Sequence, residues 1–218
     1  MSRTTRLAAV LVVAVIAVSA GCVGVLTGNQ PLTFDAQPVS VSAAAQHAAG
    51  YDHVNTTTQT LSRSFSVAGQ SRKVTVTNHL AEYGRTVSLG SFGSADLARF
   101  VVVSTPAVQV LGQTFNPVGH MSSQQLVEQV QGKYQGVSNV QPAGNRTRTL
   151  LGTSTTVSSF TADATFGGSG QSISLTIDVA KVRDGGDYVV VVAVYPTKLP
   201  GEADRVDTML TGVQHASG

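Results

Sequence analysis

Side chains that could do acid–base or metal chemistry are few in this sequence, and their spacing is unfavourable for a site. None of the five histidines belongs to an H-x-x-H or H-E-x-x-H pattern, and none stands at a Cys/His spacing that binds zinc. The five are His47, His53, His79, His120 and His215. We therefore expect solvated or loosely packed histidines, no metal ion and no cofactor.

Hydrolytic machinery is also hard to find. A nucleophilic serine on a strand-to-helix elbow would require G-x-S-x-G, which does not occur, and Gly-Gly-Ser-Gly at 167–170 is typical of a flexible hairpin loop. Acid pairs are scarce, and a glycosidase would have to draw on unpaired carboxylates such as Asp163, Asp178 and Glu128. We expect no catalytic residues.

Two further polar segments predict turns. Asp184 and Asp187 flank two glycines, and two carboxylates are too few to hold Ca²⁺ without other ligands. The segment from Asn116 to His120 (NPVGH) predicts a structural turn, with the mouth of a pocket as the alternative. Neither segment predicts a metal site.

Cys22 has the clearest chemical context because it is the only cysteine and closes the run Val-Ser-Ala-Gly-Cys. Arg3 and Arg6 form a positive n-region, and residues 7–20 are uncharged and mostly Ala, Val, Leu and Ile, as in a signal peptide. We expect cleavage before Cys22, lipidation of its sulfur, and a mature chain anchored on the extracytoplasmic face of the cell membrane. The alternative for Cys22 is an inert buried thiol without a chemical role.

Two other arrangements of the N-terminus stay open. Residues 7–26 are apolar or small throughout, and roughly 20 such residues can span a bilayer as an uncleaved helix. Simple secretion is the third arrangement. Arg3 and Arg6 would hold the N-terminus of an anchored chain in the cytoplasm, since positive charge stays inside, so the rest of the chain lies outside.

Composition excludes some partners. The 218 residues allow one domain after the signal, and only 12% of them are charged, about half the usual share. Removing Arg3 and Arg6 from the 14 basic residues leaves 12, which equals the number of acidic residues. A neutral domain without a basic stripe does not suit nucleic acid. Its surface must be rich in Ser, Thr, Gln, Asn and Gly.

Three segments predict helices. The first has apolar residues at i, i+3, i+4 and i+7 between Ser40, a candidate N-cap, and Gly50 at its end. The second begins at a capping box of Ser122 and Gln125. The last carries an apolar stripe of Val206, Met209, Leu210 and Val213.

The remaining segments predict strands joined by short loops, which favours antiparallel pairing. The apolar run at 189–194 predicts a central strand covered on both faces, and residues 141–145 predict a polar loop. The expected fold is therefore α+β: an antiparallel sheet with packed helices in the order helix, strands, helix, strands, helix. We expect a signal peptide at 1–21, a lipidated cysteine and tether at 22–38, and a single domain at 39–218.

Two Asn-x-Thr triplets are candidate N-glycosylation sites, which gain weight outside the cytoplasm. They begin at Asn55, in a Thr-rich predicted strand, and at Asn145, in the predicted polar loop.

Four segments resemble an uncharacterised family of haloarchaeal lipoproteins, a domain of unknown function. They are TNHLAEYGR, STPAVQVLGQTFNPVGHMS, LGTSTTVSSFTADATF and VYPTKLPGE. The resemblance covers nearly the whole chain, including Cys22. It implies a location at the membrane and supplies no catalytic residues.

Two classes of function follow. The first is a non-enzymatic lipoprotein of the cell envelope, tethered through Cys22, that binds a small molecule, a glycan or an envelope protein. The second is an extracytoplasmic hydrolase with an unrecognised active site. The absence of a convergent acid, base and nucleophile in the sequence favours the first class.

Overall fold

The computed structural model describes residues 31–67, 70–88, 94–110, 113–114, 116–131, 136–166 and 171–216. The chain divides into two compact units. The larger comprises Asp35–Gln59 and Thr77–Gly218, and the smaller comprises Met1–Phe34 and Thr60–Val76. Cys22, the signal-like segment, the alternative membrane helix at residues 7–26 and the glycine-rich segment at 167–170 lie outside the described residues.

The expected α+β class is wrong, because the residues that the structure describes lie mostly in β-strands. The three helices among the described residues have seven, nine and ten residues and are short beside strands of up to 19 residues. The helices are α2 (Ala43–Ala49), α3 (Ser123–Gln131) and α4 (Glu202–Thr211), with one 3₁₀ turn, η2 (Pro117–Gly119). Some segments with the Ser, Thr, Asn and Gln content of loops are parts of long strands.

The strands in chain order are β1 (Leu32–Asp35), β2 (Val39–Val41), β3 (Asp52–Val67), β4 (Gln70–Ser88), β5 (Ser94–Pro106), β6 (Gln109–Val110), β7 (Gln113–Thr114), β8 (Val137–Leu150), β9 (Thr153–Phe166), β10 (Gln171–Asp184), β11 (Asp187–Pro196) and β12 (Val213–His215). In the larger unit the main sheet has the order β4-β5-β11-β10-β9-β8, and β3 pairs with β4. The neighbours from β4 to β8 in this order are antiparallel.

The predicted central strand is confirmed. Val191 on β11 pairs with Val102 on β5 and with Ala180 on β10, so β11 lies in the interior of the sheet. Val189 and Val191 are buried on one face, and Val190 is buried on the other. A strand covered on both faces needs no alternation of apolar and polar residues, which explains its continuous apolar sequence.

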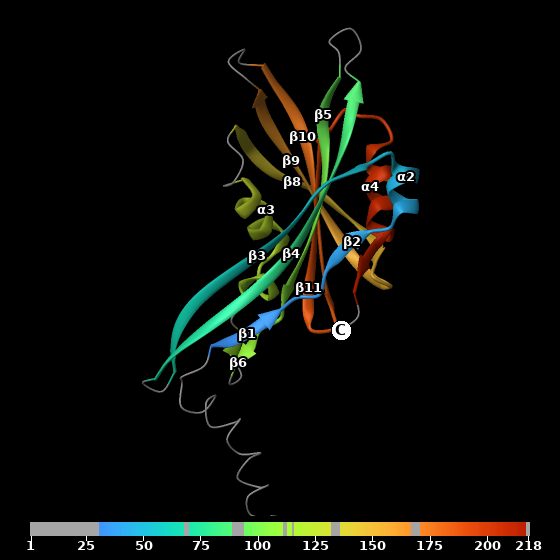
Figure 1. Cartoon of the computed structure of the whole chain (residues 1–218). Coiled ribbons are helices and arrows are strands. Elements are labelled where there is room, and N and C mark those ends of the chain that lie inside the picture. The colour runs from blue at the N-terminus through green and yellow to red at the C-terminus, as the bar shows by residue number, and fades with distance from the viewer. Residues whose placement is uncertain are drawn as a thin grey trace, which may run out of the picture. The chain divides into compact units, whose positions relative to one another are not determined.

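The two faces of this sheet have different cover (Figure 1). Helices α2 and α4 lie side by side on one face, where Tyr83, Phe100, Met209 and Leu210 belong to the main hydrophobic core. Helix α3 lies on the other face, where Leu126 and Val127 pack with Phe160 and neighbouring apolar side chains of the sheet.

The helix ends test the predicted caps. The capping box of α3 is confirmed: the Gln125 N–H donates to Ser122 Oγ at 3.2 Å, and the Ser122 N–H donates to Gln125 Oε1 at 2.9 Å. Gly50 ends α2 in the left-handed conformation, as predicted. The N-cap of α2, however, is Ser42 and not Ser40, because Ser40 lies in β2.

Three boundaries differ from the sequence-based prediction. Val213 lies in β12, beyond the end of α4. The predicted polar loop at 141–145 is wrong, because these residues continue β8 through two irregularities in its pairing with β9. Residues 32–35, in the predicted tether, form β1.

The smaller unit contains most of β1, β3 from Thr60 onward and β4 as far as Val76. Ser62 Oγ and Thr75 Oγ1 lie 2.9 Å apart and link the two long strands through exposed hydroxyls.

Candidate functional site

His215 is the histidine whose environment differs most from a solvated side chain. The imidazole of His215 is only 3% exposed. By contrast, His47 and His120 are exposed, and His53 and His79 contact the hydroxyls of Thr56 and Thr58. The expectation of solvated or loosely packed histidines therefore fails for His215.

Two carboxylates hold the imidazole of His215. Nδ1 lies 2.7 Å from Asp184 Oδ2, and Nε2 lies 3.0 Å from Asp187 Oδ2. Asp187 Oδ2 also accepts the backbone N–H of Gln37 at 2.7 Å. Carboxylates only accept hydrogen bonds, and a neutral imidazole has one N–H. Both contacts can therefore be hydrogen bonds only when His215, Asp184 and Asp187 together hold one additional proton.

The predicted Asp-Gly-Gly-Asp turn is confirmed as the turn between β10 and β11, and the structure adds His215 to it. No local pattern in the sequence indicated this contact, because His215 follows Asp187 by 28 residues. The two-stranded β2–β12 ribbon carries His215 to the turn. Within the described residues no cluster of His, Cys, Asp and Glu has the arrangement of a metal site.

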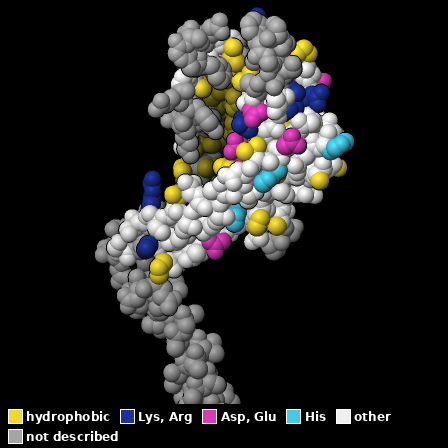
Figure 2. All heavy atoms as spheres, turned by 45° about the horizontal axis from the view of Figure 1, so that its top comes forward, with side chains coloured by type: hydrophobic (Ala, Val, Ile, Leu, Met, Phe, Trp, Pro, Cys, Tyr) yellow, Lys and Arg dark blue, Asp and Glu magenta, His cyan; other side chains and the backbone are white. Residues whose placement is uncertain are grey.

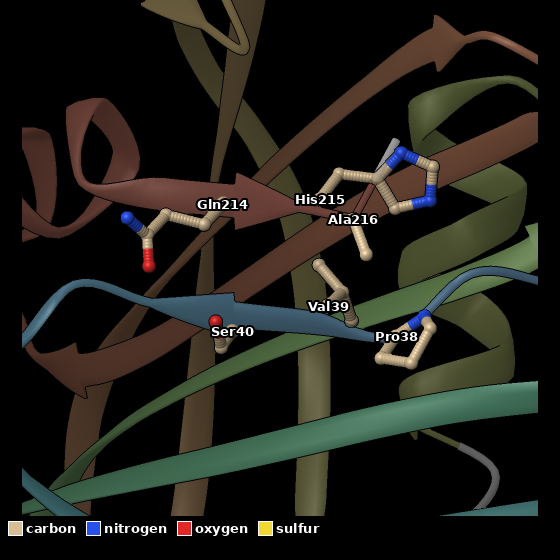
Figure 3. Close-up of a pocket in the computed structure, with 6 residues that line it drawn as sticks. All are labelled: Pro38, Val39, Ser40, Gln214, His215 and Ala216. Atoms are coloured by element: carbon tan, nitrogen blue, oxygen red, sulfur yellow. The ribbon is translucent and has the colours of Figure 1, made fainter. Parts of the chain in front are cut away.

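A surface pocket of about 300 Å³ adjoins this histidine. Figure 3 shows the residues that line it along the ribbon: Pro38, Val39, Ser40, Gln214, His215 and Ala216. Gln214 pairs with Ser40, and their side chains lie at one end of the pocket, whereas the His215 ring points away from them. The volume lies at the lower limit for ligand pockets, and an exposed amide and hydroxyl suit a small neutral ligand with hydroxyl or amide groups.

A second polar cluster surrounds Asp178, which is 2% exposed. Asp178 accepts hydrogen bonds from Arg146 Nη2 at 2.7 Å, Ser159 Oγ at 2.6 Å and Tyr195 Oη at 2.9 Å. Burial raises the pKa of the Tyr195 phenol, and the charge of Asp178 raises it further. These partners fix the carboxylate in the fold.

Arg146 connects the Asp178 cluster to α4 through a 3.0 Å bond from Nε to Asp207 Oδ1. Burial by itself lowers the pKa of the Arg146 guanidinium, but its bonds to Asp178 and Asp207 outweigh that effect, and the pKa is raised. The guanidinium therefore stays charged between two carboxylates.

The carboxylates considered for a glycosidase do not meet. Asp163 pairs with Ser174 and Asp178 pairs with Ser159, so the two acids are four positions apart along the sheet, about 13 Å at the usual rise. That exceeds the roughly 5–9.5 Å of a glycosidase acid pair. Glu128 lies on α3, where it bonds Gln124 at 3.2 Å.

A third cluster surrounds Glu202, which is fully buried at the start of α4. The Tyr51 hydroxyl donates to Glu202 Oε1 at 2.7 Å, and Arg85 forms an ion pair with the same carboxylate. Burial raises the pKa of the Tyr51 phenol, with the Glu202 hydrogen bond as the next cause. From the sequence alone, Glu202 is only a favourable charge near the positive N-terminus of a predicted helix.

The predicted turn at 116–120 has a structural role. Lys181 Nζ donates to the carbonyls of Val118, Gly119 and Met121 at 2.9, 3.2 and 2.8 Å. Burial lowers the pKa of the Lys181 ammonium. This turn does not contribute to the pocket beside His215.

Both candidate glycosylation residues lie in strands and are exposed. Asn55 is in β3, where its Nδ2 donates to Thr57 Oγ1 at 3.1 Å, and Asn145 is in β8. Among the described residues there is no helix with the length and apolar content needed to span a bilayer.

Comparison with known proteins gives a family but no activity. Residues 38–214 match the family described as a domain of unknown function (DUF6517). A search of curated proteins found no matching relative.

Proposed function

The chain belongs to the DUF6517 family, and we propose that this member is a lipid-anchored, non-catalytic binding module on the extracytoplasmic face of the cell membrane. Cys22 carries the anchor, after removal of residues 1–21. The folded part then binds a small neutral ligand, a glycan or a neighbouring envelope protein.

One observation supports lipid anchoring above all others: the only cysteine follows Arg3 and Arg6 and ends the uncharged run that comes after them. The family match supports the division of the chain, because it begins at residue 38, where the proposed tether ends. The resemblance to haloarchaeal lipoproteins supports the same location.

The proposed binding role rests on how the polar groups are used. Asp178 and Glu202 are saturated by partners from the fold, and both nitrogens of His215 face carboxylates. Charged side chains are few and scattered on the face drawn in Figure 2. A surface of hydroxyl and amide groups, such as Ser40 and Gln214 at the pocket, favours neutral polar ligands.

The anchor is tested by comparing the wild-type chain with Cys22→Ser in the cells that make it. Wild type should fractionate with membranes and have an N-terminus at a lipid-modified Cys22. Cys22→Ser should lose the modification. A serine variant that stays in the membrane with an unchanged N-terminus would support the uncleaved helix instead.

The binding role is tested by the shift in thermal unfolding caused by neutral oligosaccharides. We expect a shift that Gln214→Ala removes and that Gln124→Ala, at an exposed glutamine of α3, leaves intact. Equal shifts in both variants would place any sugar binding outside this pocket.

One observation favours the hydrolase as a second candidate. The 3.0 Å contact between His215 and Asp187 has the form of a general base held by its orienting carboxylate. Asp184 occupies the other ring nitrogen, so this base would act only after that contact opened. A screen with ester, peptide, phosphoester and glycoside substrates tests this candidate: turnover abolished in a His215→Gln variant that is still folded would support the hydrolase.

A further inference from the structure

The two Asn-x-Thr triplets lie on the two outer strands of the larger unit's sheet. Among the described strands, β8 ends the order of the sheet and pairs only with β9, and β3 pairs only with β4. Asn55 lies on the part of β3 that belongs to the larger unit, and Asn145 lies on β8. Asn55 and Asn145 are 90 residues apart in the chain, yet each lies on an outer strand of the sheet.

Edge strands of this kind need protection. An edge exposes unpaired N–H and C=O groups that can pair with another chain, and proteins usually block it with lysine, proline, bulges or a covering segment. Residues 52–59 of β3 contain no lysine, arginine or proline and a single charged residue, Asp52, and all of them are exposed. In β8, Pro142 and two pairing irregularities precede Asn145. From Asn145 to Leu150 its pairing with β9 is regular, and the two charged residues there, Arg146 and Arg148, are bonded to Asp178 and Asp207.

We propose that Asn55 and Asn145 carry N-linked glycans that shield the two sheet edges against association with other strands. This inference rests on the proposed extracytoplasmic location. A glycan is bulky and solvating, so one on each outer strand keeps a second strand away from the exposed backbone.

The local geometry presents both triplets to a modifying enzyme. In the first, the Asn55 amide already contacts the hydroxyl of Thr57, and both side chains are exposed. In the second, Arg146 is held inward by Asp178 and Asp207. Successive side chains of a strand point to opposite faces. Because Arg146 points toward Asp178 and Asp207, Asn145 and Thr147 point to the other face of β8.

The modification is a glycosyl transfer from a lipid-linked sugar phosphate, made by a membrane-bound transferase. The amide nitrogen of asparagine bonds to the anomeric carbon as the bond from that carbon to the phosphate oxygen breaks. The lipid phosphate leaves with the electron pair, and the nitrogen loses one proton to a base of the transferase. No oxidant or reductant is involved.

The test uses the full chain, tagged at its C-terminus, in the cells that make it naturally. Peptides that contain Asn55 and Asn145 are weighed by mass spectrometry, and light scattering measures the mass of the intact protein. The Thr57→Ala/Thr147→Ala pair destroys both triplets and leaves the asparagines in place. The Thr57→Ser/Thr147→Ser pair is the matched control, because serine preserves the triplet.

We expect glycan mass on both asparagines in wild type and in the serine pair. The alanine pair should lose it and at least double its average mass through self-association. Asn55→Gln/Asn145→Gln provides a second route to the unglycosylated chain and should behave like the alanine pair.

The outcomes separate this inference from the proposed function. If the chain lies on the extracytoplasmic face of the cell membrane with both asparagines unmodified, the glycan proposal is overturned and the proposed lipid anchor is unaffected. Glycosylated wild type with monomeric alanine and glutamine pairs overturns the shielding role. A chain retained in the cytoplasm overturns both the inference and the proposed location.

Discussion

His215 Nε2 lies 3.0 Å from Asp187 Oδ2, and this contact fastens the last strand, β12, to the residue at which β11 begins. The same carboxylate oxygen receives the backbone N–H of Gln37, which precedes β2 by two residues. Asp187 therefore joins the N-terminal and C-terminal segments of the larger unit to one hairpin of its sheet.

Replacing His215 with leucine should destabilise the fold. The change leaves the buried Asp187 carboxylate with fewer hydrogen bonds, and an unmet buried polar group costs about 1–3 kcal/mol. Urea unfolding at neutral pH measures the loss. His47→Leu is the matched control at an exposed histidine and should change stability by less than about 0.5 kcal/mol. Equal stabilities for the two variants would contradict a fastening role.

Asp178→Ala should cost more than Asp163→Ala. Removing Asp178 leaves the Arg146 guanidinium and the Tyr195 hydroxyl without their buried acceptor, and breaking a buried charge pair costs roughly 3–5 kcal/mol. Asp163 is partly exposed and contacts Asn139 at 2.9 Å, so its loss should cost about 1 kcal/mol. Calorimetric melting of both variants gives the comparison, and the reverse order would reject the assigned importance of the Asp178 cluster.

Val191→Asp should unfold the larger unit. Val191 is 2% exposed in the interior strand β11, and an unpaired charge there has a cost of several kcal/mol. Val54→Asp is the control because Val54 is a 50% exposed strand residue. Circular dichroism and melting should show loss of structure only for Val191→Asp. A cooperative transition like that of wild type would argue against the interior position of β11.

Tyr51→Phe should weaken the alkaline sensitivity of the protein. Burial, followed by the Glu202 hydrogen bond, raises the pKa of Tyr51 in the folded state above the value of about 10 in an unfolded chain. Between the two values the unfolded chain releases the proton and the folded chain keeps it. Stability from this phenol is therefore complete below pH about 10 and is lost as the pH rises further.

Urea midpoints measured from pH 8 to 11 test this expectation. The wild-type midpoint should fall with pH more steeply than that of Tyr51→Phe. The Tyr51→Phe/Tyr195→Phe pair should flatten the dependence further, because burial raises the pKa of Tyr195 in the same direction. Parallel curves for all three proteins would refute the role of the buried phenols.

Local signals in the sequence predicted several elements correctly. The Ser122–Gln125 capping box forms with both of its hydrogen bonds, and Gly50 ends its helix, because caps involve residues within a few positions of each other. The apolar run at 189–194 predicted an interior strand, since only a strand covered on both faces buries such a run in a sheet. The Cys22 anchor stays a prediction.

The class of the fold was decided by contacts far apart in the sequence. Residues 141–145 have the polar composition of a loop, yet pairing with β9 extends them as strand. Strand preference depends on cross-strand neighbours more than on the residues themselves, so a threonine- and asparagine-rich segment is ambiguous until its partner is known. That ambiguity led to the expectation of an α+β fold in place of a mostly β one.

By itself the sequence determined the capping box of α3, the glycine that ends α2, the central strand and the choice of residues able to bear a lipid or a glycan. Tertiary structure alone decided that His215 meets Asp184 and Asp187, and that Glu202 meets Tyr51 across 151 positions. Caps and apolar runs act over a few residues, whereas these polar contacts arise only when the sheet and its helices bring distant side chains within hydrogen-bond range.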